Sequence, residues 1–186
     1  MSPWHAIAIF AAGIFAGTIN TIIGSGTLVT FPVLLGFGYA PVVANVSNTV
    51  GLVPGFVSGT VGYRRELSGQ RARLTSLAGA SVTGSVIGAV LLLSLPATAF
   101  GAVVPAFIAI AVLLILLQPR LSRRLSSPRP RARARVGPIP TLGVLIGGIY
   151  GGYFGAAQGI LVLAVLGLSV EDDLQRLNAL KVVLTG

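Results

Sequence analysis

Polar residues that could bind a small anion interrupt an otherwise apolar chain in a few short stretches. Hydroxyl and amide side chains there can donate hydrogen bonds, and a helix beginning near Gly26 would add backbone N–H groups and a positive dipole end. The candidate binding residues are Asn20, Thr21, Gly24, Ser25, Gly26, Thr27, Asn45, Ser47, Asn48, Gln158, Asn178 and Lys181. Ordinary hydrogen bonding between membrane helices is the alternative explanation for the same polar side chains.

Lys181 carries the most specific chemistry among these residues. An ionisable side chain within an apolar segment is costly, and its default interpretation is functional, here as the counter-charge of an anion. The alternative is that its amine extends to the membrane surface or pairs with the acids at 171–173. Arg176, about one turn from the start of the same segment, is expected to extend to the surface.

Side chains for metal binding and catalysis are scarce. The chain has no cysteine, one histidine (His5) and four acids, so we predict no metal site and no cofactor. Ser25, between two glycines, resembles the nucleophile of an intramembrane serine hydrolase, which needs a positioned base such as His5 or Lys181. We predict that the protein is not an enzyme, and the serine hydrolase stays open as an alternative, as does a channel or scaffold protein.

The composition is that of a membrane protein. Of the 186 residues, 54% are hydrophobic and 9% are charged, with a mean hydropathy of +0.91, which is too apolar for a soluble domain. Since a spanning helix needs about 20 apolar residues, the chain has room for about five or six. The apolar run after Trp4 has no Lys or Arg before it, so we do not interpret it as a removed signal peptide.

The positive charge is concentrated between apolar segments. The formal net charge is +9, and eleven of the thirteen basic residues lie within 64–73 and 120–135. This pattern is typical of cytoplasmic loops, so we predict that 63–73 and 118–138 face the cytoplasm of a multi-pass inner-membrane protein. It argues against nucleic acid as a partner and favours the lipid bilayer and a small anion. The stretch 119–138, rich in Arg and Pro, is either a solvated linker or a contact with anionic lipid.

Residues 4–38 form an uncharged stretch that is too long for one span and too short for two. Its polar and glycine residues near position 24 would break a helix, and such a break is tolerated at membrane depth only where protein or water covers it. We therefore predict a re-entrant hairpin of two half-helices. Ordinary spans are predicted to follow at 41–62, 74–95 and 97–117.

An internal repeat relates the two ends of the chain. Residues 13–17 align with 148–152, and Gly24 aligns with Gly159, at a constant offset of 135. Slightly later, 45–48 align with 178–181, which pairs Asn48 with Lys181 near the membrane midplane. Because three spans separate the two starts, the second copy is inverted, and inverted repeats with broken helices are typical of secondary transporters.

The predicted fold is therefore an all-α membrane bundle with inverted repeats and re-entrant broken helices. Its parts are a first repeat (1–118), the linker (119–138) and the start of an incomplete second repeat (139–186), in which a glycine-rich segment is followed by a helix from about 175. Glycines at four-residue spacing are predicted to allow close helix packing. They are Gly51, Gly55 and Gly59 in one ladder and Gly147, Gly151, Gly155 and Gly159 in the other.

Two segments resemble the paired signatures of the TauE/SafE sulfite exporter family. Residues 17–32 (GTINTIIGSGTLVTFP) and 41–48 (PVVANVSN) resemble the first signature, and 150–159 (YGGYFGAAQG) with 178–181 (NALK) resembles the second. The resemblance implies two inverted four-segment repeats and proton-coupled transport of sulfite, sulfonates or related small organic anions. Family members usually continue for about two more spans, as completing the second repeat requires. No pattern in the chain indicates an oligomeric state or a transport direction.

Overall fold

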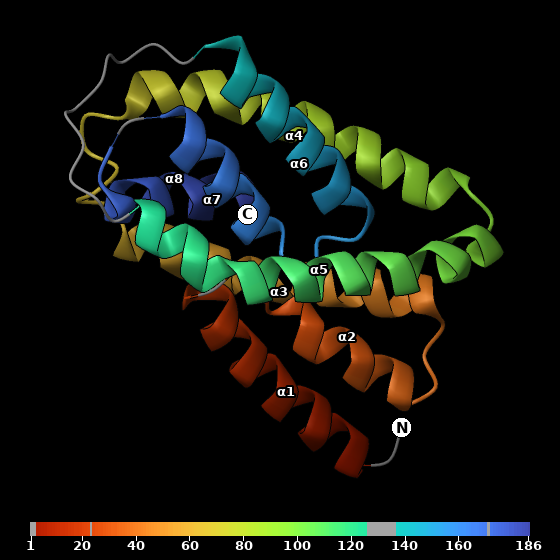
Figure 1. The fold of residues 1–186 in the computed structure, drawn as a ribbon. Coiled ribbons are helices and arrows are strands. Elements are labelled where there is room, and N and C mark those ends of the chain that lie inside the picture. The colour runs from red at the N-terminus through yellow and green to blue at the C-terminus, as the bar shows by residue number, and fades with distance from the viewer. Residues whose placement is uncertain (1–2, 23, 126–136, 171) are drawn as a thin grey trace.

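The computed structural model describes residues 3–22, 24–125, 137–170 and 172–186, and every regular element within these ranges is a helix (Figure 1). The prediction of an all-α protein is confirmed. Residues 126–136 of the predicted linker and Glu171 lie outside the described residues. The helices are α1 (Pro3–Ile22), α2 (Thr27–Gly36), α3 (Pro41–Gly62), α4 (Arg71–Ser94), α5 (Ala97–Leu125), α6 (Pro138–Tyr153), α7 (Gln158–Ser169) and α8 (Leu174–Thr185).

The outer surface of the helices is strongly apolar. Phe10 of α1, Leu93 of α4 and Leu116 of α5 are 71%, 73% and 65% exposed. Within the described residues, α4 and the 98–120 part of α5 are long and apolar enough to cross a membrane. α3 has the length as well, and its asparagines lower its mean hydropathy. A surface of this kind faces lipid, so the chain is a helical membrane protein.

Proline marks the start of two helices but does not end a third. Proline begins α3 and α6, where its fixed φ and missing N–H suit the first turn. α5 runs eight residues past the predicted end at 117, with Pro105 and Pro119 both inside it. The first residues of the predicted linker, 119–125, thus belong to α5, because a proline inside a membrane helix removes one hydrogen bond without ending the helix.

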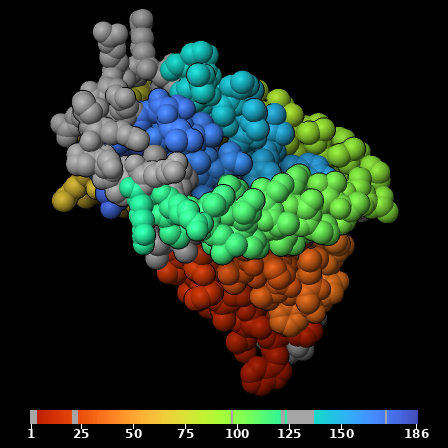
Figure 2. Space-filling model, in the orientation of Figure 1, coloured from red at the N-terminus to blue at the C-terminus, as the bar shows by residue number. Residues whose placement is uncertain are grey.

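α1 and α2 form a hairpin that projects from the body of the molecule as a wedge (Figure 2). The helical break includes residues 24–26, at the glycines where the sequence predicts it. The two arms are unequal, however, since α1 has 20 residues and α2 has ten. At 1.5 Å per residue α1 is about 30 Å long, so α2 alone has the length of a half-helix.

The most extensive contact between two helices is that of α4 with α6, which lie side by side in Figure 1. Gly84 and Gly88 of α4 meet Gly148 and Gly152 of α6 so closely that an added Cβ would strike the backbone of the facing helix. This pair of glycine stripes was not predicted from the sequence. By contrast, Gly51, from the ladder predicted to pack, has no neighbour within 4 Å of an added Cβ, and neither has Gly55.

An aromatic cluster ties the first hairpin to the end of α6. Phe31 of α2 lies edge-to-face against Phe154, with ring centroids 5.2 Å apart. Phe100 and Phe107 of α5 complete the cluster, and Phe107 also contacts Tyr153 edge-to-face. A second apolar cluster joins α4, α6, α7 and α8. The aromatic cluster holds the two broken segments against each other, and the second cluster packs α7 and α8 against α4 and α6.

Candidate functional site

The two broken segments touch each other through glycine backbone. Gly24, between α1 and α2, has a left-handed φ of +81°, and a Cβ added to it would lie 2.9 Å from the Cα of Gly159. The reverse contact, from Gly159 to the Cα of Gly24, is equally close. The internal alignment pairs these two glycines, and the structure places them in contact. Any side chain at either position would separate the two segments.

Asn20 holds the first break in shape. Its side-chain Oδ1 accepts a hydrogen bond of 3.2 Å from the N–H of Gly26, and its backbone oxygen accepts one of 2.8 Å from the N–H of Gly24. Gly26 is pressed against α1, because an added Cβ would lie 2.5 Å from the oxygen of Ala16. Thus two of the candidate residues, Asn20 and Gly26, define where α2 begins.

The second break, at 154–157, is built from left-handed backbone. Gly155 has φ +77° and Ala157, which precedes α7, has φ +58°, a conformation that costs a non-glycine residue energy. The hydroxyl of Tyr150 donates a 2.6 Å hydrogen bond to the backbone oxygen of Ala156 and so bridges the break. α7 then begins at Gln158, with its first N–H groups near Gly24.

A cavity of about 380 Å³ opens where the two breaks meet. Four of the candidate residues line it: Asn20, Gly24, Thr27 and Gln158. Polar residues from three other helices also line it: Thr49 of α3, Ser81 and Ser85 of α4, and Thr185 of α8. Glycines of the second broken segment complete this part of the wall: Gly151 and Gly152 of α6, Gly155 of the break, and Gly159 of α7. The volume lies in the range of pockets that hold small ligands.

The asparagines of α3 are bonded to neighbouring helices. Asn48 donates a 3.0 Å hydrogen bond to the hydroxyl of Thr27 and accepts one from the hydroxyl of Thr30. Asn45 donates a 3.0 Å bond to the backbone oxygen of Tyr153, which connects α3 to the second break. These contacts are the interhelical hydrogen bonding that the sequence analysis gives as the alternative explanation.

Lys181 and Ser25 are buried, and neither side chain has a hydrogen-bond or ion-pair partner among the described residues. Lys181 is 2% exposed, and its Cδ lies 3.4 Å from the position of a Cβ on Gly159. No acid among the described residues pairs with it. The Oγ of Ser25, a residue 3% exposed, likewise has no hydrogen-bond partner within the described part of the chain.

Two further candidates do not line the cavity, and a third has a side chain outside the described residues. Ser47 is exposed on α3, and Asn178 is half-buried on α8 outside the cavity wall. The side chain of Thr21 lies outside the described residues. His5, the base considered for Ser25, stacks on Phe37 with ring centroids 4.7 Å apart, at the opposite end of α1 from the break.

Sequence reasoning missed the contribution of α4 to the cavity wall. Ser81 and Ser85 line it, and the hydroxyl of Ser81 donates a hydrogen bond to the backbone oxygen of Leu184. The signal was present, because Ser81, Ser85 and the glycines Gly84 and Gly88 form one stripe of small residues along α4.

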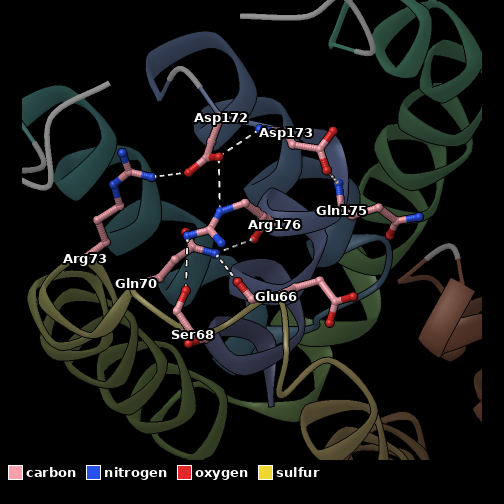
Figure 3. Close-up of polar contacts among 8 residues, drawn as sticks. All are labelled: Glu66, Ser68, Gln70, Arg73, Asp172, Asp173, Gln175 and Arg176. Atoms are coloured by element: carbon pink, nitrogen blue, oxygen red, sulfur yellow. Dashed lines mark hydrogen bonds and ion pairs between the residues drawn. The ribbon is translucent and has the colours of Figure 1, made fainter. Parts of the chain in front are cut away.

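An ion-pair cluster joins the start of α4 to the connection between α7 and α8 (Figure 3). Arg73 donates to Oδ2 of Asp172, and the Nε of Arg176 lies 3.2 Å from Oδ1. Arg176 also donates a 3.3 Å hydrogen bond to the backbone oxygen of Ser68. Asp172 and Ser68 thus bind the guanidinium of Arg176, whose side chain is 25% exposed.

The electrostatics of this cluster favour the charged carboxylate. Burial by itself raises the pKa of Asp172, and three contacts act in the opposite direction: a 2.9 Å hydrogen bond from the N–H of Asp173 and the guanidinium groups of Arg73 and Arg176. Together they hold the pKa of Asp172 below its ordinary value. The carboxylate is thus ionised at neutral pH and ties the 63–73 loop to the α7–α8 connection.

Known proteins resemble this chain over most of its length. The family model "Sulfite exporter TauE/SafE" matches residues 9–186. The chain is 29% identical over 164 residues to "Probable membrane transporter protein YfcA" of Escherichia coli (strain K12). The matched region covers 86% of this chain and 58% of that protein. It is 31% identical over 161 residues to "Probable membrane transporter protein ORF9" of Sinorhizobium sp, covering 84% and 59%.

The chain therefore spans less than three fifths of the length of these curated relatives. No solved structure gives a significant match.

Proposed function

Because the chain belongs to the sulfite exporter TauE/SafE family, we propose that it acts as a secondary transporter that carries a small anion across the inner membrane. The proposed cargo is sulfite, a sulfonate or a related organic anion, moved with the proton gradient. The observation that carries the proposal is the contact between the two broken segments at Gly24 and Gly159, beside a cavity and a buried lysine. Paired broken helices of this kind form the substrate sites of secondary transporters.

The anion is proposed to bind between the N-termini of α2 and α7. The positive ends of both helix dipoles and their first N–H groups favour negative charge. Lys181, buried beside Gly159, would supply the positive charge that balances the anion. The bound anion would in turn explain why a lysine is buried with no acid of the described residues beside it. The Oγ of Ser25 has no hydrogen-bond partner among the described residues, and Gln158 carries an amide donor on the cavity wall.

The transport cycle is proposed to use two inverted repeats, 1–118 and 139–186, joined by the 119–138 linker. The glycine contact would lie on the axis that relates the repeats, and alternate exposure of the cavity would come from rocking of one repeat against the other. The basic loops 63–73 and 118–138 would face the cytoplasm. The ion pair of Arg73 with Asp172 supports this topology, since it joins two segments that are both expected on that side.

A carrier explains the site better than the alternatives. For a serine hydrolase, Ser25 lacks a base at His5, which lies 20 residues earlier at the far end of α1, about 25 Å along the helix. Loss of peptide cleavage in Ser25→Ala, without transport in any variant, would favour that enzyme. A channel would give flux that neither saturates nor shows counterflow.

The test is uptake of labelled sulfite, taurine and sulfoacetate into proteoliposomes that contain the protein at its natural full length, with and without a pH gradient. We expect saturable, gradient-dependent uptake of at least one anion. Lys181→Ala should weaken that uptake by about tenfold or more, because hydrogen bonds to a charged group are lost, while insertion is preserved. Arg123→Ala is the matched control, since it removes one positive charge from an exposed position.

Two outcomes would overturn the assignments. Absence of saturable uptake for all three anions would remove the carrier function. Unchanged uptake by Lys181→Ala would remove Lys181 from the binding site and leave the rest of the proposal intact.

A further inference from the structure

Gln158 presents an unbonded amide to the cavity. It is the first residue of α7, it is 8% exposed, and it lines the cavity beside Gly24 and Gly159. Its side chain makes no hydrogen bond within the described part of the chain. The atoms of this amide are open to the cavity, where water or a ligand can supply their hydrogen-bond partners.

Gly151 determines where this amide lies. A Cβ added to Gly151 would overlap the Nε2, Cδ and Oε1 atoms of Gln158, so the amide rests directly on the Cα of Gly151 on the wall formed by α6. These atoms are the far end of a flexible side chain, and no backbone atom is nearer. A side chain at position 151 would therefore displace the amide and leave the helices in place.

The other glycines of this part of α6 meet different neighbours. Gly148 and Gly152 face the backbone of α4, where an added Cβ on Gly148 would lie 2.7 Å from the oxygen of Ser81. Gly147 faces the side chains of Leu161 and Val162 at 3.3 Å, a contact that small shifts can accommodate. Of these four glycines, Gly151 alone lies against a polar side chain of the cavity.

We propose that Gly151 is a specificity-determining residue that sets the largest anion the cavity accepts. With glycine at this position, the Gln158 amide lies back against α6 and occupies only the edge of the cavity. With a larger residue, the amide moves inward and narrows the space beside the N-terminus of α7. This inference rests on the proposed transport function and concerns the size of the cargo.

The experiment compares sulfite with the bulkier sulfoacetate in proteoliposomes, as the ratio of kcat/KM for uptake of the two anions. Gly151→Ala should lower the sulfoacetate-to-sulfite ratio by about tenfold or more, since one methyl group in a fitted pocket discriminates to that extent. Gly147→Ala, one turn earlier on the same helix, is the matched control and should leave the ratio unchanged.

A second-site change separates this role from a packing role. In Gly151→Ala/Gln158→Ala the shorter side chain no longer enters the cavity, so the ratio should return toward the wild-type value. Gln158→Ala alone should raise the sulfoacetate-to-sulfite ratio above the wild-type value, because it removes the amide from the edge of the cavity. A defect caused by poor helix packing would persist in the double variant.

The outcomes separate a failure of the proposed transport function from a failure of the inference about Gly151. If the wild-type protein takes up neither anion, the proposed function fails. If the wild-type protein takes up sulfite or sulfoacetate and Gly151→Ala keeps the wild-type ratio, or keeps its defect after Gln158→Ala, the inference about Gly151 is overturned. Should Gly151→Ala fail to accumulate in the membrane, a wild-type ratio in Gln158→Ala alone would overturn it equally.

Discussion

Asp172 is a single carboxylate that faces two guanidinium groups, and its removal should be costly. Asp172→Asn removes the carboxylate that pairs with the buried Arg73 and with Arg176, so we expect a loss of about 3 kcal/mol in unfolding free energy. The measurement is thermal unfolding of the purified protein in detergent. Asp173→Asn is the control, because the exposed residue 173 only caps α8 and asparagine caps equally well.

The pH dependence of this effect has a defined sign. Because the folded protein lowers the pKa of Asp172, the unfolded chain binds more protons, and stability falls as the pH falls. The difference between the wild-type protein and Asp172→Asn should stay constant from pH 8 to about 5. It should shrink as the pH passes below about 3.9, the ordinary pKa of aspartate, and through the lower folded value. A difference independent of pH down to pH 3 would contradict an electrostatic origin.

Individual residues were predictable where backbone chemistry decides their position. Asn20, Gly24 and Gly26 were identified because polar groups and glycines break an apolar helix, and the structure places them at the break. Ser47 was not predictable in the same way. It precedes the buried Asn48 by one residue, which is about 100° around the helix, and the sequence does not say which side of α3 meets α2.

At the scale of the elements, the α4–α6 contact should be the most sensitive to added volume. Gly88→Ala places a methyl group against the backbone oxygen of Ile149, which cannot move without shifting α6, so we expect a loss of about 1–3 kcal/mol. Thermal unfolding in detergent measures this loss. Gly79→Ala, on the same helix with open space around it, is the control. Equal stability of the two variants would show that the helices are less closely packed.

Helix positions were largely predictable, whereas helix partners were not. The span 41–62 coincides with α3, and the predicted turn at Pro96 separates α4 from α5. The contact between Gly88 and Gly152 depends on how α4 and α6 meet in space, and several helices carry glycines at the same spacing. Tertiary contacts selected one pair of stripes from equivalent candidates, which local sequence rules do not do.

At the scale of the whole molecule, the predicted topology can be tested without background labelling, because the chain has no cysteine. Single cysteines at the exposed positions Ala40, Ser68 and Arg120 report the α2–α3 connection, the α3–α4 connection and the C-terminal part of α5. We expect a membrane-impermeant maleimide on intact cells to label Ala40→Cys. Ser68→Cys and Arg120→Cys should react only after the membrane is permeabilised. Labelling of Ser68→Cys in intact cells would reverse the orientation derived from the basic loops.

The hydrogen bond from Asn45 to the backbone oxygen of Tyr153 has a consequence for biosynthesis. The two residues are 108 positions apart, so at about 5–20 residues per second the acceptor is synthesised about 5–20 s after the donor. Throughout this interval the amide of α3 has no native acceptor. The first hairpin and α3 can therefore dock against α6 only late in synthesis. Until α6 is inserted, the machinery that inserts α3 must keep the polar amide of Asn45 away from lipid.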